Sequence, residues 1–206
     1  MNCLNTLSTD HRSVAVSGFE NDRVLSSRRY GGCAILWRKA LFLTATPIFT
    51  HSRRICAMLF NGNGFSFLCI CVYMPFEKDS NSVDEFQGQL SIIDSVVSQY
   101  PNSHVILGGD FNVNLSRNWC NTRLLNDYCR QPCMFHVFRH EHSTVDYTHH
   151  FNMKYFNNHF IVSEQLYQAA ILKQFVLHDV DNTSDHDPIC IHVALDVAHM
   201  SACYTP

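Results

Sequence analysis

A carboxylate and an amide follow a short apolar run in the middle of the chain, where residues 105–112 read Val-Ile-Leu-Gly-Gly-Asp-Phe-Asn. The three apolar residues predict a strand that is buried on both faces, and we expect Gly108 and Gly109 to end it. Asp110 and Asn112 then follow the strand and, two residues apart in an extended chain, project to the same side. An aspartate can take a proton from a water while an asparagine donates a hydrogen bond to a phosphate oxygen. An ordinary polar turn after a strand has the same pattern.

A second group of ionisable residues lies near the other end of the chain. Residues 183–190 read Thr-Ser-Asp-His-Asp-Pro-Ile-Cys. Asp185 offers a hard oxygen ligand for a metal ion, and the imidazole of His186 titrates near pH ~6.5. Because four aspartates fall within residues 179–187, their mutual repulsion requires a cation or hydrogen-bond donors nearby. A solvated acidic loop with a surface histidine is the simpler alternative.

Asp146 is the third candidate for chemistry. It lies in residues 144–147, Thr-Val-Asp-Tyr, which have the composition of a strand. A carboxylate is costly to bury inside a strand unless it is paired. A histidine is a natural partner, because an aspartate that hydrogen-bonds an imidazole fixes its orientation in hydrolytic triads. We therefore expect Asp146 to pair with a histidine.

Hydrophobic periodicity predicts the elements that hold these side chains in place. Apolar residues recur at helical spacing over residues 83–97, with Ser82 as the N-cap, and residues 119–130 allow a second helix. Strand-like segments occur at residues 13–19, 32–37, 54–60, 65–73, 134–138, 144–148, 158–162, 171–177 and 189–195. Residues 61–64, Asn-Gly-Asn-Gly, predict a hairpin between two of them. Strands dominate and helices fall between groups of strands, which predicts an α+β sandwich of two sheets with helices outside.

A single folded domain accounts for all 206 residues, of which 46% are hydrophobic and 16% charged. No apolar run reaches the roughly 18 residues of a membrane helix, and the first residues carry no signal-peptide pattern. We therefore expect an intracellular protein, nuclear or cytoplasmic, with no membrane partner. The ten cysteines include no C-x-x-C pair, and five of them lie in strand-like runs, namely Cys33, Cys56, Cys69, Cys71 and Cys190. This pattern predicts reduced, buried thiols rather than disulfides.

Charge is distributed unevenly along the chain. Residues 23–76 hold seven basic residues and no acidic one, whereas the remainder holds eight basic and eighteen acidic residues. A basic third beside an acidic remainder suits a polyanion-binding face next to a metal-binding face. Solvated strand ends and turns would give the same pattern. The seven basic residues are Arg23, Arg28, Arg29, Arg38, Lys39, Arg53 and Arg54.

In combination, four short motifs resemble the endonuclease/exonuclease/phosphatase superfamily. In chain order they are Tyr73-x-Pro75, Gly109-Asp110-Phe111-Asn112, Asp146-Tyr147 and Ser184-Asp185-His186. Two longer stretches are most similar to the apurinic-type endonuclease domain of non-LTR retrotransposons, namely Arg28-x-Tyr30-Gly31-Gly32-x-Ala34-Ile35-Leu36 and Ile106-x-Gly108-Gly109-Asp110-Phe111-Asn112. The resemblance covers about residues 13–195.

The resemblance implies a fold, a reaction and several roles. The fold would be a four-layer α/β sandwich of two mostly antiparallel sheets flanked by helices. The reaction would be hydrolysis of DNA phosphodiesters by an activated water with Mg²⁺ or Mn²⁺. The resemblance implies that Asp110 deprotonates the water, that Asn112 holds the water or a phosphate oxygen, and that Tyr73 lies against the phosphate. Arg28 and Arg29, in the matching basic stretch, are the further candidates for substrate binding.

The resemblance also implies a phosphate contact and a metal ligand. His186, positively charged and oriented by Asp146, would contact the scissile phosphate, and Asp185 would help to bind the metal. A cation, an imidazolium and neutral donors would then meet the charge that develops on the phosphoryl oxygens.

Two departures from the family pattern bear on activity. The family's first strand carries an asparagine and its second ends in Gln-Glu, whose glutamate is the principal metal ligand, and the matching region here starts after both. Glu20 follows Gly-Phe in an expected loop and does not replace that glutamate. Phe76 stands where many members have a polar residue, which predicts a weaker substrate groove. Our hypothesis is an N-terminally truncated endonuclease domain that lacks the first strands and has little or no activity.

The sequence leaves two other functions open, and it also leaves open whether the substrate is DNA or a lipid or sugar phosphate. A non-catalytic nucleic-acid-binding remnant would use the basic third and bind DNA without a metal. A zinc module could use a group of histidines, namely His136, His140, His142, His149 and His150. The first pair has the spacing of one helical face, although residues 135–138 alternate more like a strand. Lipid and sugar phosphatases share the superfamily, and the retrotransposon-like spacing around Tyr30 makes DNA the expected substrate.

Overall fold

A computed structural model describes residues 9–18, 31–41, 44–62, 64–130, 134–149 and 155–194. The candidates Arg28 and Arg29 lie outside these residues, as do Glu20 and His150. The described strands are β1 (His11–Val16), β2 (Cys33–Arg38), β3 (Thr44–Ile48), β4 (Ile55–Asn61), β5 (Ser66–Tyr73), β6 (His104–Asp110), β7 (Met134–His136), β8 (Asn158–Ser163), β9 (Ile171–Val176) and β10 (Ile189–Val193). The described helices are α1 (Ser80–Ser98), α2 (Cys120–Cys129) and α3 (Glu164–Ala169), with the 3-10 helices η2 (Lys39–Leu41) and η3 (Val137–Arg139).

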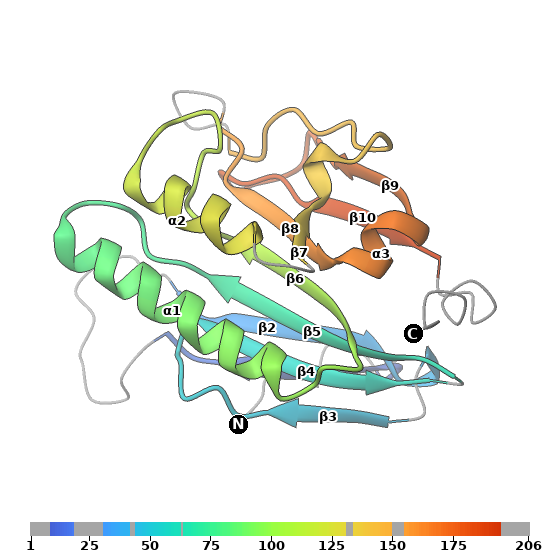
Figure 1. Ribbon diagram of the computed structural model, residues 1–206. Coiled ribbons are helices and arrows are strands. Elements are labelled where there is room, and N and C mark those ends of the chain that lie inside the picture. The colour runs from blue at the N-terminus through green and yellow to red at the C-terminus, as the bar shows by residue number, and fades with distance from the viewer. Residues whose placement is uncertain are drawn as a thin grey trace.

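A six-stranded sheet in the order β3-β4-β5-β6-β8-β7 runs through the centre of the protein (Figure 1). β4 and β5 pair antiparallel, as the hairpin signal predicts. β5 and β6 pair in parallel, because α1 carries the chain back between them. β8 then returns antiparallel to β6. As a result, the ends of β5 and β6 and the start of β8 meet at one end of the sheet.

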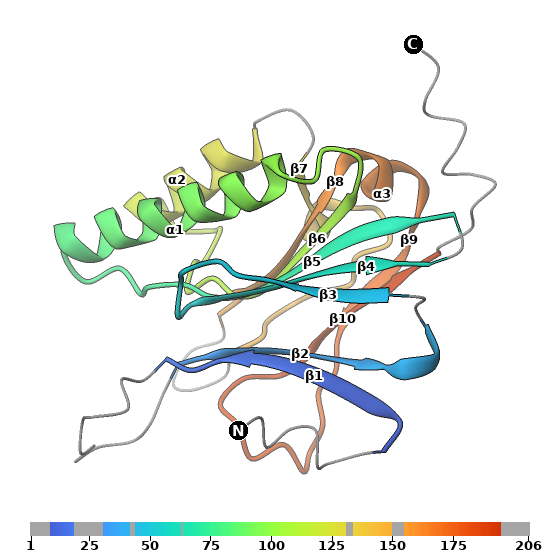
Figure 2. The ribbon, with the colours of Figure 1, turned by 90° about the horizontal axis from the view of Figure 1, so that it is seen from below.

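α1 and α2 lie side by side over one face of this sheet (Figures 1 and 2). Their buried side chains recur at helical spacing and pack on the inner strands, namely Phe86, Leu90, Ile93 and Val96 of α1 with Leu125 and Tyr128 of α2. The two predicted helices are thereby confirmed, but Ser82 is not the N-cap of the first. The N-cap is Asp79, whose Oδ1 accepts the backbone N–H of Ser82 at 2.9 Å while the Ser82 hydroxyl accepts the N–H of Asp79 at 3.0 Å. This reciprocal capping box starts the helix earlier than the apolar pattern does.

Two hairpins pack against the other face of the large sheet (Figure 2). The β1–β2 hairpin packs on β4 and β5, and β10 of the β9–β10 hairpin contacts β8. Ile106 of β6 contacts the apolar clusters beneath both hairpins. In the described residues the hairpins are separate two-stranded sheets. The predicted α+β sandwich, with mostly antiparallel packed sheets and flanking helices, is confirmed.

Three parts of the predicted pattern differ from the structure. Residues 144–148 are not a strand, and isolated bridges form only at the flanking residues, from Ser143 to Gln174 and from His149 to Tyr155 and His186. β3 was not predicted, because Pro47 interrupts its pattern; the proline is tolerated since β3 is the edge strand of the sheet. α3 was also not predicted, because six residues are too few to establish helical periodicity.

Cysteines contribute to the layer between the β1–β2 hairpin and the large sheet. Cys33 and Cys56 are buried there, next to the partly buried Cys69 and Cys71. The cysteines in the described residues are free thiols, in agreement with their prediction as small apolar side chains. No helix in the described residues is long and apolar enough to cross a membrane.

Candidate active site

Four residues at one end of the large sheet form a row across adjacent strands. The backbone N–H of Tyr73 donates to the carbonyl of Arg54 at 2.9 Å, which pairs the residue before β4 with the end of β5. Tyr73 pairs in register with Asp110 of β6, and Asp110 pairs with Asn158 of β8. Neighbouring strands lie about 4.8 Å apart. The four residues therefore form a row across the sheet, perpendicular to the strands, in the order Arg54, Tyr73, Asp110 and Asn158.

Gly109 allows β6 to lie closer to β5 than a residue with a side chain would allow. We expected the strand to end at Gly108 and Gly109, but β6 continues to Asp110. Gly109 has φ +143°, and a Cβ atom there would lie 2.1 Å from the carbonyl oxygen of Val72 on β5. A side chain at this position would therefore push β5 and β6 apart. The close approach sets the distance between Tyr73 and Asp110.

Asp110 and Asn112 form a tight turn rather than an extended segment. Asn112 has φ 51°, a left-handed conformation that asparagine tolerates better than most residues. Its backbone N–H donates to Oδ1 of Asp110 at 2.9 Å, and its side-chain amide donates to the carbonyl of Met74 at 2.9 Å. The expected projection of both side chains from an extended chain is thus wrong, although the turn still holds them beside each other.

The sequence-distant motifs meet around the Asp110 carboxyl. Burial raises the pKa of Asp110, and the charge of Asp185 adds to this rise. The backbone N–H of Asn112 and the charges of His186 and His149 act in the opposite direction. An aspartate of the 110 region and the Asp185-His186 pair therefore share one electrostatic environment, as the four-motif hypothesis requires.

His186 is oriented by Asn158 and not by Asp146. Its Nδ1 lies 2.9 Å from Oδ1 of Asn158, whose backbone is in register with Asp110. The His186 ring also packs edge-to-face on His149, with 4.8 Å between ring centroids. Asn158 was missed in the sequence, where its only signal is a polar residue at the start of a strand-like segment.

Asp146 pairs with a different histidine. Its Oδ1 lies 3.0 Å from Nε2 of His178, and Nδ1 of His178 lies 2.7 Å from Oδ2 of Asp187. The hydrogen bond with Asp187, followed by that with Asp146, raises the pKa of His178. The side chain of Asp146 is 59% exposed, so it does not occupy a buried strand position. The prediction that Asp146 pairs with a histidine is right, but the histidine is not the one at the site.

A smaller pocket of about 210 Å³ opens next to Asn112. Arg117 lies between two rings, with its guanidinium carbon 4.8 Å from the centroid of Trp119 and 4.7 Å from that of Tyr155. Phe76 completes the wall, edge-to-face with Trp119. The remaining lining residues are asparagines, namely Asn112, Asn114 and Asn157. Aromatic faces beside amides suit a planar polar ligand such as a nucleobase.

Glu77 fixes the wall of this pocket. Its Oε1 accepts the backbone N–H of Cys120 at 3.2 Å and its Oε2 that of Asn121 at 2.7 Å, which places a carboxylate at the N-terminus of α2. Trp119, the N-cap residue, makes no side-chain cap of its own. Glu77 thus satisfies free N–H groups, interacts favourably with the helix dipole and ties the Phe76 loop to Trp119.

The donors at the site fit a hydrated cation that the substrate helps to hold. Mg²⁺ commonly takes one or two protein carboxylates together with waters and phosphate oxygens, and Asp110 and Asp185 could supply these. Across the described ranges, no group of three or more His, Cys, Asp or Glu side chains is placed to hold a metal ion. A preformed cage does not fit these residues, and the described histidines proposed for the zinc module form no such group either.

The histidines proposed for zinc lie in several different settings. His136 is 3% exposed in β7, and within the described part of the chain neither of its ring nitrogens has a hydrogen-bond partner. Burial lowers its pKa to about 3. His140 and His142 follow η3 outside the core. The strand-like alternation of residues 135–138 was therefore the better guide at His136.

Solved structures share this fold. No protein-family model matches the sequence, and no curated protein matches it either. The endonuclease domain of TRAS1, a telomere-specific non-LTR retrotransposon, matches with a TM-score of 0.68 and 14% identity over 90% of this chain and 79% of that one. A mannosyl-6-phosphatase of Bacteroides thetaiotaomicron matches with a TM-score of 0.65 and 15% identity over 93% and 80% of the two chains. A Neisseria 3′ phosphatase bound to a product DNA hairpin matches with a TM-score of 0.64 and 13% identity over 90% and 80%.

These matches establish the fold. The chain has the fold of the endonuclease/exonuclease/phosphatase proteins, as its motifs indicate. Solved proteins with this fold include two phosphatases and an endonuclease domain.

Proposed function

We propose that the protein hydrolyses DNA phosphodiester bonds. Asp110, Asn112 and His186 would surround the scissile phosphate, with a divalent cation, Mg²⁺ or Mn²⁺, held by Asp185. The observation that carries the proposal is the convergence of Asp110 and His186, through Asn158, at one end of the sheet. The fold shared with a retrotransposon endonuclease domain supports it.

In this proposal the side chains have distinct tasks. Asp110 accepts a proton from a water molecule while the oxygen of that water forms a bond to phosphorus. At the same time the bond between phosphorus and the leaving deoxyribose oxygen breaks. The leaving oxygen takes a proton from solvent, which yields a phosphomonoester and a free hydroxyl group. Burial, which raises the pKa of Asp110, makes it a stronger base. The cation, when bound, stabilises charge on the phosphoryl oxygens.

The partner of His186 limits its contribution. Oδ1 of Asn158 only accepts, so Nδ1 of His186 carries a hydrogen, and Nε2 can donate to a phosphate only when the ring is an imidazolium. A neutral amide stabilises that cation less than a carboxylate would. Changes in such supporting contacts cost about 10–100-fold in metal affinity or activity. We therefore propose slow hydrolysis.

The pocket next to Asn112 supports DNA over a sugar or lipid phosphate. Phe76, Trp119 and Tyr155 present aromatic surface within reach of the scissile position. Stacking of a base on an aromatic side chain contributes about 1–3 kcal/mol. Phe76, which was expected to weaken the groove, is instead part of this aromatic wall.

Plasmid nicking tests the proposal. Supercoiled plasmid would be incubated with the purified chain and Mg²⁺ or Mn²⁺, beside an Asp110→Ala variant and an Asp127→Asn control, which removes an exposed carboxylate of α2. We expect slow nicking that Asp110→Ala abolishes and Asp127→Asn leaves unchanged. Nicking that persists in Asp110→Ala, or wild-type protein that neither nicks nor binds DNA, would contradict the proposal.

One observation favours a second candidate function. Because the described residues form no group of three metal ligands, the same site could bind DNA without cutting it. Such a protein would bind DNA with an affinity that falls with salt and does not respond to chelator. Binding in EDTA together with an absence of nicking would favour this alternative.

A further inference from the structure

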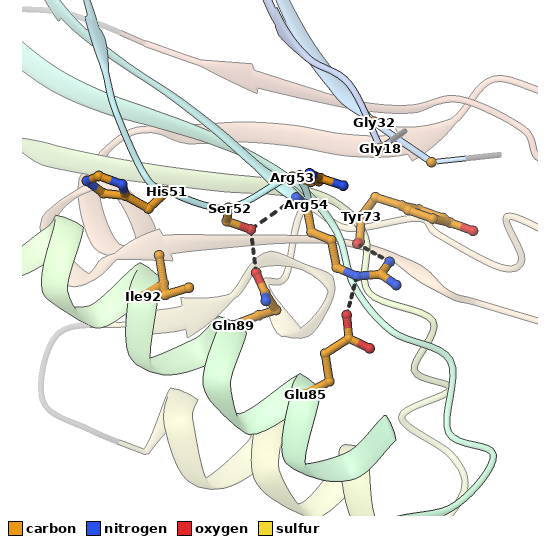
Figure 3. A pocket seen from close by; sticks show the side chains of 11 residues that line it. Gly18, Gly32, His51, Ser52, Arg53, Arg54, Tyr73, Glu85, Gln89 and Ile92 are labelled. Atoms are coloured by element: carbon orange, nitrogen blue, oxygen red, sulfur yellow. Dashed lines mark hydrogen bonds and ion pairs between the residues drawn. The ribbon is translucent and has the colours of Figure 1, made fainter. Parts of the chain in front are cut away.

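A second, larger cavity lies along the row of strands, on the other side of Tyr73 from Asp110. It measures about 400 Å³ and is enclosed by residues 51–54, which lead from β3 into β4, and by α1 (Figure 3). The roles derived above use none of its residues except Tyr73. Its lining residues are Gly18, Gly31, Gly32, His51, Ser52, Arg53, Arg54, Tyr73, Glu85, Gln89 and Ile92.

Arg54 is held in a fixed position with one donor group left over. Its Nε donates to Oε1 of Glu85 at 2.7 Å, and its Nη1 donates to the carbonyl of Tyr73 at 3.2 Å. The guanidinium carbon also lies 5.6 Å from the centroid of the Tyr73 ring. Among the residues that the structure describes, Nη2 has no hydrogen-bond partner, and the side chain is 30% exposed. The guanidinium is therefore preorganised to donate to an anion in the cavity.

The walls around Arg54 are also fixed. The hydroxyl of Ser52 donates to Oε1 of Gln89 at 2.6 Å and accepts the backbone N–H of Arg54 at 3.0 Å, which ties the turn to α1 (Figure 3). On the opposite wall, Gly32 has φ +97°, and a Cβ atom there would lie 2.9 Å from the carbonyl of Val16. The close approach of these backbone segments requires glycine at this position, and the described part of this wall consists of Gly18, Gly31 and Gly32.

Charge and spacing both point to a nucleic-acid phosphate. Arg53 and Arg54 come from one turn, and the carboxylate of Glu85 is already paired with Arg54. Arg54 is two strands away from Asp110, a separation of about 10 Å at the usual strand spacing. Each nucleotide advances one DNA strand by about 3.4 Å. Because successive phosphates lie farther apart than this axial rise, Arg54 is within about three nucleotides of the scissile position.

We propose that this cavity binds a phosphate group of the substrate strand, within about three nucleotides of the scissile bond, with Arg54 Nη2 as the donor. The inference rests on the proposed function, because it takes Asp110 as the position of the scissile phosphate. It adds a specific backbone contact that holds the strand in register across the row of strands.

Salt-dependent binding tests the cavity directly. Anisotropy of a fluorescein-labelled DNA duplex of about 20 base pairs would be titrated in EDTA at several NaCl concentrations. For Arg54→Gln we expect about 10-fold weaker binding and a log–log salt slope smaller in magnitude by about 0.9, the loss of one phosphate contact. For Glu85→Gln we expect several-fold tighter binding, because the carboxylate no longer competes with the phosphate for Arg54.

Two control variants make the same charge changes elsewhere. Arg130 and Asp127 form an exposed ion pair on and just after α2, with side chains 79% and 64% exposed. Arg130→Gln and Asp127→Asn should change affinity by less than about twofold. Circular dichroism establishes whether each variant folds, and if Arg54→Gln does not, Glu85→Gln decides, since it keeps the guanidinium.

The outcomes separate the two proposals. Wild-type protein that shows no salt-dependent DNA binding, either in EDTA or in a parallel titration with Mg²⁺, would overturn the proposed function itself. Wild-type binding with an unchanged slope in Arg54→Gln, or with no gain in Glu85→Gln when Arg54→Gln is unfolded, would overturn only the cavity.

Discussion

Two histidines near the same end of the protein have opposite surroundings. His178 lies between the carboxylates of Asp187 and Asp146, at 2.7 and 3.0 Å. His186 hydrogen-bonds through Nδ1 to the neutral amide of Asn158 at 2.9 Å. The first imidazole thus has two anionic partners, and the second has one neutral partner.

The comparison separates a structural histidine from one that is available to a substrate. Both ring nitrogens of His178 are occupied, and the hydrogen bonds with Asp187 and Asp146 raise its pKa. Among the described residues Nε2 of His186 has no hydrogen-bond partner, which leaves it available to a ligand next to the buried carboxyl of Asp110. The number of free donor positions, and not the number of acidic neighbours, distinguishes the two.

Substitution of His186 and of His178, one at a time, should give the largest difference between the two histidines. We expect His186→Gln to slow Mg²⁺-dependent plasmid nicking by about 100-fold or more, the usual range for loss of an acid–base or phosphate-contacting group. His178→Gln should change the rate by less than about threefold. Equal losses in the two variants would show that the carboxylate-flanked histidine also acts on the substrate.

A third environment extends the comparison to histidines with apolar neighbours. Burial lowers the pKa of His136 to about 3 and that of His159 to about 4. Because the unfolded chain binds these protons near pH ~6.5, stability is present above that value and is lost as pH falls toward the folded pKa values. Between pH 6.5 and 5 we expect a loss of about 2 kcal/mol per histidine, measured by urea unfolding.

A leucine substitution isolates the contribution of one buried ring. His136→Leu should remove about half of this acid sensitivity, because no hydrogen-bond partner of the ring is lost. His142→Leu, at a side chain 51% exposed, is the matched control and should leave the acid sensitivity unchanged. If the stability of His136→Leu depended on pH as that of the wild type does, His136 would not be a source of the acid sensitivity.

Asn158→Asp makes the surroundings of His186 more like those of His178. A carboxylate at this position would favour the imidazolium and so strengthen donation by Nε2. We expect nicking about 10-fold faster than in the wild type, within the range for such supporting contacts. Asn157→Asp, one residue earlier, adds the same charge without the bond to His186. A rate increase of equal size there would argue for a general charge effect.

The smallest expected effect concerns His178 itself. Because its folded pKa is raised, its stabilisation is present below pH ~6.5 and is lost as pH rises through the folded value. The side chain is 39% exposed, so solvent screening limits the contribution to less than about 1 kcal/mol. Urea unfolding of the wild type and His178→Asn at pH 6 and pH 9 measures it, and a larger loss at pH 9 would contradict the sign.

Local pattern was sufficient to predict much of the fold. Two apolar runs and the turn residues between them predicted β4 and β5, helical spacing predicted α1, and residues 119–130 allowed α2. β3 was not predicted because it contains Pro47. A strand tolerates a proline at an edge of a sheet, and the edge position of β3 is visible only in the strand order. Sandwich architecture followed from the order of elements.

The site was only partly predictable, because pairing depends on register. Asp110, Asp185 and His186 were found from residue type and motif, and they share one environment. The partner of His186 could not be found in this way, since Asn158 faces Asp110 only through the β6–β8 register. Asp146 has the right residue type and lies instead beside His178.

The most direct test of the account is the pKa of the Asp110 carboxyl, measured by carbon-13 NMR titration in three proteins. In the wild type we predict a value above that of an ordinary aspartate, because the group is buried. In His186→Gln the value should rise further, since a stabilising positive charge is removed, and in His178→Gln it should stay as in the wild type. An Asp110 pKa that does not respond to His186→Gln would contradict the claim that the two residues form one site.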